Sequence, residues 1–205
     1  MHTVKMNGIN YSLTDVEKDC WRRLLNGALK GKDPLHNPTV ANVNIHGVNL
    51  RTVVLRKVVT AQKTLTFHTD VRSGKWKELS ENNDISWLFY DAGARIQIRL
   101  AGKASLHNVD DIANEAWRNS TANSRKVYSG NVAPSQISEM PTSGLPTVEN
   151  TKQTIEKSEA GRENFGLVIT KINWMEWLWL NSEGHCRASF IYNDDESIVA
   201  NWIVP

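Results

Sequence analysis

The feature that most constrains this sequence is a series of short segments between residues 39 and 106, rich in β-branched and aromatic residues and separated by turn residues. Short strands that recur at such close intervals are typical of an antiparallel sheet or barrel, and not of alternating strand–helix units. We therefore predict a mainly β structure of the α+β class. The expected strands are 39–45, 49–60, 64–69, 85–90 and 96–106.

A long helix is predicted over residues 12–30. Apolar side chains recur there at every fourth position, which gives one buried stripe. Ser12 or Thr14 can cap its first turn, where acidic residues also suit the helix dipole. Shorter helices are expected near 76–80 and 110–117.

The second half of the chain has a different composition. Residues 130–162 are rich in Pro, Gly and Ser and then in polar residues, so we expect a mobile connecting segment with a helix near 148–160. Residues 163–205 return to strand-like patterning and are expected to complete the same barrel. A chain of 205 residues fits one substantial domain, so a single domain over 1–205 is predicted.

Composition argues against several classes of protein. The chain has 24 basic and 22 acidic residues, a net charge of +2, which argues against a bulk nucleic-acid binder. Its apolar runs fall short of the roughly 18 residues that a membrane span needs, and no leader pattern follows Met1. Two cysteines, Cys20 and Cys186, cannot make a disulfide framework. We therefore expect a cytoplasmic protein that binds neither nucleic acid nor membranes.

Positive charge is concentrated in one region. Seven basic residues and one acid lie between Arg51 and Lys77, a local charge of +6. Such a patch on a near-neutral chain indicates an anion site. Residues 73–75, Ser-Gly-Lys, open the short predicted helix with a capping hydroxyl, an accessible backbone and a cation, which suits a phosphate. The alternative is a solvated basic hairpin.

Two further segments could recognise a ring. Gln97 lies on a predicted strand, and its amide can donate and accept together, as the edge of a flat heterocycle requires. The tail around Trp177 and Arg187 could stack on a ring and hold an anion. The alternatives are an ordinary exposed glutamine and a hairpin whose tryptophans fill a core. We predict no metal site, because the histidines and cysteines lack ligand spacing. We also predict no catalytic side chain.

A family resemblance rests on four segments that occur in order. Residues 51–56 read Arg-Thr-Val-Val-Leu-Arg, and 67–75 read Phe-His-Thr-Asp-Val-Arg-Ser-Gly-Lys. Residues 96–104 read Ile-Gln-Ile-Arg-Leu-Ala-Gly-Lys-Ala, and 177–190 form the Trp-rich ending. Together they resemble the pyridoxamine 5′-phosphate oxidase-related family of FMN-binding proteins, over about residues 35–205.

The resemblance implies a six-stranded antiparallel split β-barrel with flanking helices. It also implies a homodimer with FMN at the subunit interface. The implied activity is that of an FMN-dependent oxidoreductase of vitamin B6 metabolism, which oxidises a pyridoxamine or pyridoxine phosphate-type or related small substrate with O2 as acceptor. The alternative is a flavin-binding or flavin-reductase-like protein without vitamin B6 oxidase activity.

The resemblance also implies, by position, which residues bind the cofactor and the substrate. Gly74 stands where the oxidase has an arginine. The oxidase's Arg-x-His-x-Arg is here His185-x-Arg187-x-Ser189, so the flavin site is better supported than the vitamin substrate site. His185 and Arg187 are the implied substrate residues. The implied FMN residues are Arg51, Thr52, Val53, Val54, Leu55, Arg56, His68, Thr69, Arg72, Ser73, Lys75, Gln97 and Trp177.

Overall fold

The computed structural model describes residues 2–145 and 154–205. The chain forms two compact units. The first unit comprises Met1–Phe67, Asp84–Ala104 and Thr170–Pro205, and the second unit comprises His68–Asn83 and Ser105–Ile169. Three β-strands run from one unit into the other. The expected single domain over residues 1–205 stays a prediction.

The first unit begins with a small hairpin and a helix. Strands β1 (Val4–Met6) and β2 (Ile9–Tyr11) pair with each other. Helix α1 (Leu13–Leu29) confirms the helix expected over residues 12–30. A capping box explains where it begins, because Ser12 Oγ accepts from the Asp15 amide at 3.3 Å and Asp15 accepts from the Ser12 amide at 2.9 Å.

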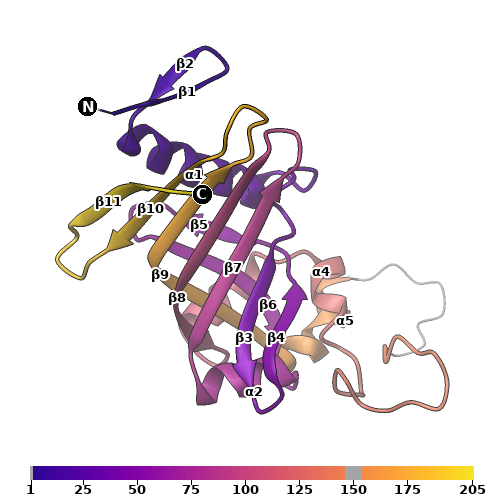
Figure 1. Ribbon diagram of the computed structural model, residues 1–205. Coiled ribbons are helices and arrows are strands. Elements are labelled where there is room, and N and C mark those ends of the chain that lie inside the picture. Colours follow the sequence, from indigo (N-terminus) through magenta and orange to yellow (C-terminus); the bar gives the residue numbers. More distant parts are fainter. Residues whose placement is uncertain (1, 146–153) are drawn as a thin grey trace. The chain divides into compact units, whose positions relative to one another are not determined.

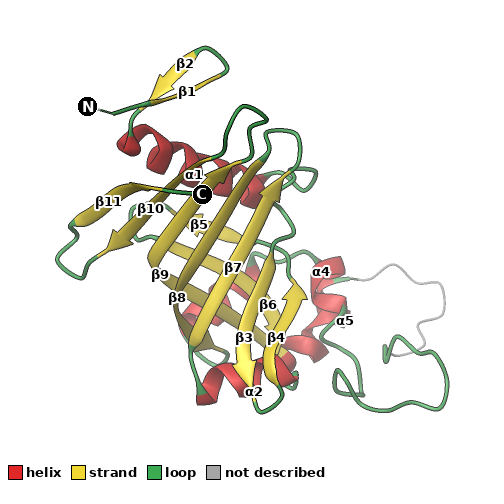
Figure 2. Ribbon diagram, viewed as in Figure 1, coloured by secondary structure: helices red, strands yellow, loops and turns green. Residues whose placement is uncertain are grey.

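A nine-stranded sheet dominates the part of the chain that the structure describes. The strand order is β11-β10-β9-β8-β7-β3-β4, and β6 pairs with β5 and β9. Figure 1 shows β7, β8 and the C-terminal half of β9 side by side, and Figure 2 shows how strands outweigh helices. This mostly antiparallel sheet confirms the mainly β prediction. The strands are β3 (Thr39–Asn44), β4 (Gly47–Thr52), β5 (Lys57–Val59), β6 (Thr64–Asp70), β7 (Asp84–Asp91), β8 (Ile96–His107), β9 (Phe165–Trp179), β10 (Cys186–Tyr192) and β11 (Ile198–Ile203).

The sheet differs from the expected barrel in two respects. It has nine strands and not six, and among the described residues the ladder is not closed. The strand expected over 49–60 is two strands, because residues 53–56 leave the ladder. Their amides bond elsewhere: that of Val53 donates to the Pro38 carbonyl, that of Leu55 to His36, and that of Arg56 to Thr66.

Aromatic side chains fill the core of the first unit. Trp87 stacks on Phe89 with ring centroids 5.9 Å apart and meets Phe67 edge-on at 5.6 Å. Its indole N–H donates to Thr170 Oγ1 at 3.2 Å, so this buried polar group has a hydrogen-bond partner. Trp177 is also fully buried and meets Trp202 edge-on.

The second unit holds most of the short helices. Helices α2 (Gly74–Glu81) and α3 (Asp111–Arg118) confirm those expected near 76–80 and 110–117. Trp117, Tyr128 and Phe165 form its apolar core. Buried Arg125 lies over the Trp117 ring and pairs with Glu159. The remaining elements are α4 (Ala122–Lys126), α5 (Ile155–Ser158) and the 3-10 helix η1 (Glu159–Asn164).

The connecting segment is described in part. Residues 130–145 contain no helix or strand. The helix expected over 148–160 corresponds to α5 and η1 in its later half, while residues 148–153 lie outside the described residues. Mobility of 130–162 stays a prediction. No helix within the described ranges is long and apolar enough to cross a membrane.

We predict that Gly102→Ala destabilises the sheet. Gly102 lies where β8 passes close to β9, and a Cβ there would collide with the carbonyl oxygen of Lys171. Overpacking of this kind costs about 1–3 kcal/mol of unfolding free energy. Urea denaturation measures it. Gly31→Ala is the matched control, because a Cβ at Gly31 meets nothing within 4 Å, and an equal loss in both variants would contradict the prediction.

Candidate functional site

The turn between β6 and α2, in the second unit, gathers two buried hydroxyl groups. Ser73 is the N-cap residue of α2, but its side chain makes no capping hydrogen bond. Its Oγ donates instead to the Asp70 carbonyl at 2.7 Å and lies 3.2 Å from Thr69 Oγ1. Both side chains therefore lie together at the beginning of the helix, next to its partial positive charge.

Lys75 adds a cation to these hydroxyls. Its Nζ donates to Thr69 Oγ1 at 3.0 Å, and the side chain is half-buried. A helix start and an ammonium form a donor set suited to a phosphate group. Ser73 and Lys75, expected at such a site from the sequence, are thus brought together with Thr69.

Arg72 is held by its own turn. Its guanidinium contacts both carboxylate oxygens of Asp70, at 3.0 and 2.7 Å, and also donates to the Gly130 carbonyl at 2.8 Å. The hydrogen bonds to Asp70 raise the pKa of Arg72. Because its charge is matched by the Asp70 carboxylate, Arg72 shapes the turn and ties it to Gly130.

The turn between β6 and α2 packs against the beginning of β9. The Val71 amide donates to the Asn164 carbonyl at 3.0 Å. Trp76 lies against Gly166, where any Cβ would collide with the indole ring. His68, another expected site residue, meets Phe165 edge-on with ring centroids 4.8 Å apart. These contacts with the beginning of β9 hold the turn in place.

The expected site residues 51–56 lie in the first unit. Arg51 is on β4 and donates to the side chain of Asn42 on the neighbouring β3. Thr52 ends the strand, and the segment that follows alternates between buried Val53 and Leu55, half-buried Val54 and exposed Arg56. Because the ladder is broken between Arg51 and Arg56, the alternation of side chains along a strand does not determine whether the two lie on the same face.

Gln97 and Trp177 have different environments in the first unit. Gln97 is half-buried on β8, opposite Tyr90 of β7. Trp177 is 1% exposed, pairs with Ala188 and packs on Trp202. Its placement matches the alternative in which the tail tryptophans fill a core.

The expected substrate residues lead to a cluster that the sequence analysis missed. His185 is exposed, whereas Arg187 donates to buried Glu176 at 2.6 Å. Arg99 contacts the other oxygen of Glu176 at 3.2 Å. A single acid between apolar Met175 and Trp177 was the signal that could have revealed it.

Residues 18–108 match the family model described as pyridoxamine 5′-phosphate oxidase, FMN-binding domain. A pyridoxamine 5′-phosphate oxidase-related, FMN-binding protein from Nostoc punctiforme superposes with a TM-score of 0.72 at 19% identity, over 92% of this chain and 97% of that one. PhzG from Burkholderia lata, solved with tetrahydrophenazine-1-carboxylic acid, gives 0.68 at 14% identity, over 92% and 91%. The search of curated proteins found no match.

These findings bear out the expected fold and cofactor. At such identities the two structures establish a shared fold and no more. The matched segment contains residues 51–56, the turn at Ser73 and Lys75, and Gln97. The matched domain is an FMN-binding domain, which confirms FMN as the cofactor. Residues 18–108 of this chain are thus similar to the FMN-binding domain of pyridoxamine 5′-phosphate oxidase.

Proposed function

We propose that this protein is an FMN-dependent oxidoreductase of the pyridoxamine 5′-phosphate oxidase type. The proposed reaction is oxidation of a pyridoxamine or pyridoxine phosphate-type or related small substrate, with O2 as acceptor. The observation that carries it is the cluster of Thr69, Ser73 and Lys75 at the beginning of α2, within an FMN-binding domain. FMN supplies the redox chemistry when it is bound. The side chains of the chain bind and orient it.

The cluster has the properties that a phosphate monoester needs. Lys75 supplies a positive charge, and its Nζ lies beside the hydroxyls of Thr69 and Ser73, which hydrogen-bond within the turn. The first turn of a helix presents amide N–H groups without intrahelical acceptors. Asp70 holds the guanidinium of Arg72, so we assign the direct phosphate contact to Lys75 and the shape of the turn to Arg72.

The other expected cofactor residues extend this proposal. We propose that Arg51, Arg56 and the backbone of residues 52–55 contribute along the cofactor, and that the Gln97 amide bonds the edge of the flavin ring. The side chain of Gln97 is half-buried, so its amide can contact the ring, whereas Trp177 is buried within its own chain. We therefore base the ring contact on Gln97 and not on Trp177, and we keep His68 as a neighbour of the phosphate turn.

A second candidate function is flavin binding without vitamin B6 oxidation. It is favoured by the pairing of Arg187 with Glu176, which engages an expected substrate residue within the chain. Ser189 also stands where the family pattern has its last arginine. The two candidates share the FMN site and differ in the substrate site.

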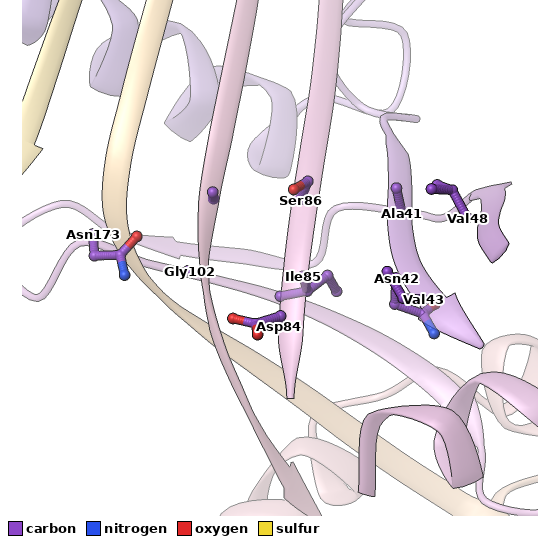
Figure 3. Close-up of a pocket in the computed structure, with 10 residues that line it drawn as sticks. Ala41, Asn42, Val43, Val48, Asp84, Ile85, Ser86, Gly102 and Asn173 are labelled. Carbon is purple, nitrogen blue, oxygen red and sulfur yellow. The ribbon is translucent and has the colours of Figure 1, made fainter. Parts of the chain in front are cut away.

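An exposed apolar face supports a homodimer. Val43, Val48, Leu50, Leu88 and Tyr90 are each at least 40% exposed. The registers Val43↔Val48 and Thr39↔Leu88 place them on one face of β3, β4 and β7. A groove of about 350 Å³ runs along this face, with Asn173 of β9 beyond β8 (Figure 3). Contiguous apolar surface of this kind marks an interface, and we propose a second copy of the chain as its occupant, with FMN at the subunit interface.

We also propose a cytoplasmic location. Cys20 is fully buried and Cys186 partly buried, and both are free thiols. Unpaired cysteines suit a reducing compartment.

The proposed function is tested by incubating the purified protein with FMN and pyridoxamine 5′-phosphate under air. We expect bound flavin absorption and steady release of hydrogen peroxide. Flavin binding without peroxide would favour the second candidate. A protein that takes up no FMN would contradict both candidates.

We predict that Lys75→Met weakens FMN binding about 10- to 100-fold, because a hydrogen bond to a charged group contributes on the order of 1.5–3 kcal/mol. Quenching of FMN fluorescence gives the dissociation constant. Lys77→Met is the control, since Lys77 lies two residues along the same helix and is exposed. Equal effects of the two substitutions would remove Lys75 from the phosphate site.

We predict that Leu50→Asp converts the dimer to a monomer, because a carboxylate on the apolar face would have to lose its hydration at the interface. Sedimentation velocity measures the change. Val109→Asp, an exposed apolar position in the second unit, is expected to leave the dimer intact. A Leu50→Asp protein that stays dimeric would place the interface elsewhere.

A further inference from the structure

Three polar side chains of the second unit form a hydrogen-bonded chain that neither the proposed FMN site nor the proposed dimer interface uses. Ser105 and His107 are two residues apart on β8, so their side chains lie on one face of the strand. Ser105 Oγ lies 3.0 Å from His107 Nε2, and His107 Nδ1 lies 2.7 Å from Asp110 Oδ2. Hydroxyl, imidazole and carboxylate thus follow one another in the order of a nucleophile, its base and the group that orients the base.

Asp110 is held in place by the helix that follows it. It is the N-cap residue of α3, and its Oδ1 accepts from the Ala113 amide at 2.9 Å, which leaves Oδ2 for His107. The little burial that Asp110 has would by itself raise its pKa, but the hydrogen bonds from the Ala113 amide and from His107 lower that pKa. The carboxylate is therefore ionised at neutral pH and is fixed toward the imidazole.

The tautomer of His107 follows from this contact. An ionised carboxylate can only accept hydrogen bonds, so Nδ1 carries a proton, and Nε2 of the neutral ring has the free lone pair. Nε2 then accepts from the Ser105 hydroxyl. The Ile169 carbonyl is another acceptor near Ser105 Oγ, at 3.3 Å, and it receives the hydroxyl proton when the ring is doubly protonated. The neutral ring is thus placed to remove the proton of Ser105.

The exposure of the three side chains suits a reaction with a molecule from solution. Ser105 is exposed, so a reagent can reach its hydroxyl. The His107 side chain is 16% exposed, so the imidazole is largely shielded from water. Shielding strengthens the electrostatic interaction between the imidazole and the Asp110 carboxylate.

We propose that Ser105 is an activated nucleophile that accepts an acyl group from small aryl esters, with His107 as its base and Asp110 as the positioning residue for His107. Ser105 Oγ forms a bond to the ester carbonyl carbon while its proton moves to His107 Nε2. The bond from that carbon to the aryl oxygen then breaks, and the departing phenolate takes the proton. Water cleaves the acyl-serine by the same route, which releases a carboxylic acid and restores Ser105.

Aryl esters are the expected class because of their leaving group. A phenolate departs more readily than an alkoxide or an amine, so the reaction needs less electrostatic stabilisation from the protein. The reaction requires no oxidant and no flavin, so the proposal does not rest on the proposed oxidoreductase function.

Covalent labelling of the full chain with diisopropyl fluorophosphate, with and without FMN, tests the nucleophile. The reagent forms a bond between the serine Oγ and phosphorus and releases fluoride, and peptide mass spectrometry measures the rate at each serine. Ser197 is the internal control, because it is exposed and its hydroxyl donates to the Asp195 carboxylate instead of an imidazole. We expect Ser105 to react at least about tenfold faster, since a positioned base contributes on the order of 10²–10⁴-fold. Equal rates at the two serines, or an unlabelled Ser105, would overturn the proposal.

Hydrolysis of 4-nitrophenyl acetate assigns the roles of the hydroxyl and the imidazole. We expect Ser105→Ala and His107→Gln each to lose most of the activity of the parent protein, because each removes one partner of the same proton transfer. Activity that persists in Ser105→Ala but is lost in His107→Gln would make the imidazole itself the nucleophile and would overturn the role of Ser105.

Asp110→Asn tests the positioning role. Asparagine also caps a helix, so the melting temperature is expected to stay unchanged, whereas the charge that orients the imidazole is removed. We expect labelling of Ser105 to slow about tenfold, with partial recovery in Asp110→Glu, which restores a carboxylate. Unchanged labelling in Asp110→Asn, or no recovery in Asp110→Glu, would remove Asp110 from this role.

FMN affinity, measured on the same variants, separates this inference from the proposed function. It is expected to match that of the parent protein, because Ser105, His107 and Asp110 are not part of the proposed phosphate turn. Fast labelling of Ser105 in a protein that binds no FMN would support the nucleophile and contradict the oxidoreductase. Normal FMN binding with an unlabelled Ser105 would do the reverse.

Discussion

The contact between Asp70 and Arg72 is the interaction on which the proposed cofactor site depends. Asp70 is buried, so its carboxylate must be paired, and both of its oxygens receive the guanidinium. The Asp70 carbonyl also receives the Ser73 amide and hydroxyl. Together these bonds close the turn before α2 and bring Thr69, Ser73 and Lys75 to one place. Within the basic patch, Arg72 is held by Asp70, and we assign the phosphate contact to Lys75.

Much of the fold was predictable because its signals are local. The Ser12–Asp15 capping box lies within four residues, and the apolar stripe of α1 recurs every turn. The break within the strand expected over 49–60 could not be predicted in this way, because β-branched residues such as Val53 and Val54 favour a continuous strand. The break comes from amide bonds to His36, Pro38 and Thr66, which no local pattern reveals.

In the candidate site, too, some features have a local sequence signal and others depend on contacts between distant parts of the chain. Ser73 and Lys75 stand out in the sequence as a hydroxyl and a cation at a helix start. The commitment of Arg72 to Asp70 and Gly130 depends on a carbonyl far along the chain. Glu176 went unnoticed because it is a single acid in an apolar strand, and its meaning appears only when β8 and β10 bring Arg99 and Arg187 to it. Trp177, expected at the flavin, is enclosed by Ala188 and Trp202.

We propose that the beginning of α2 recognises the phosphate of the flavin nucleotide. The most direct measurement is a parallel fluorescence titration of the purified protein with FMN and with riboflavin, which lacks the phosphate. We expect riboflavin to bind at least about tenfold more weakly, since charge-assisted contacts to the phosphate are lost. Equal affinities for the two flavins would contradict it.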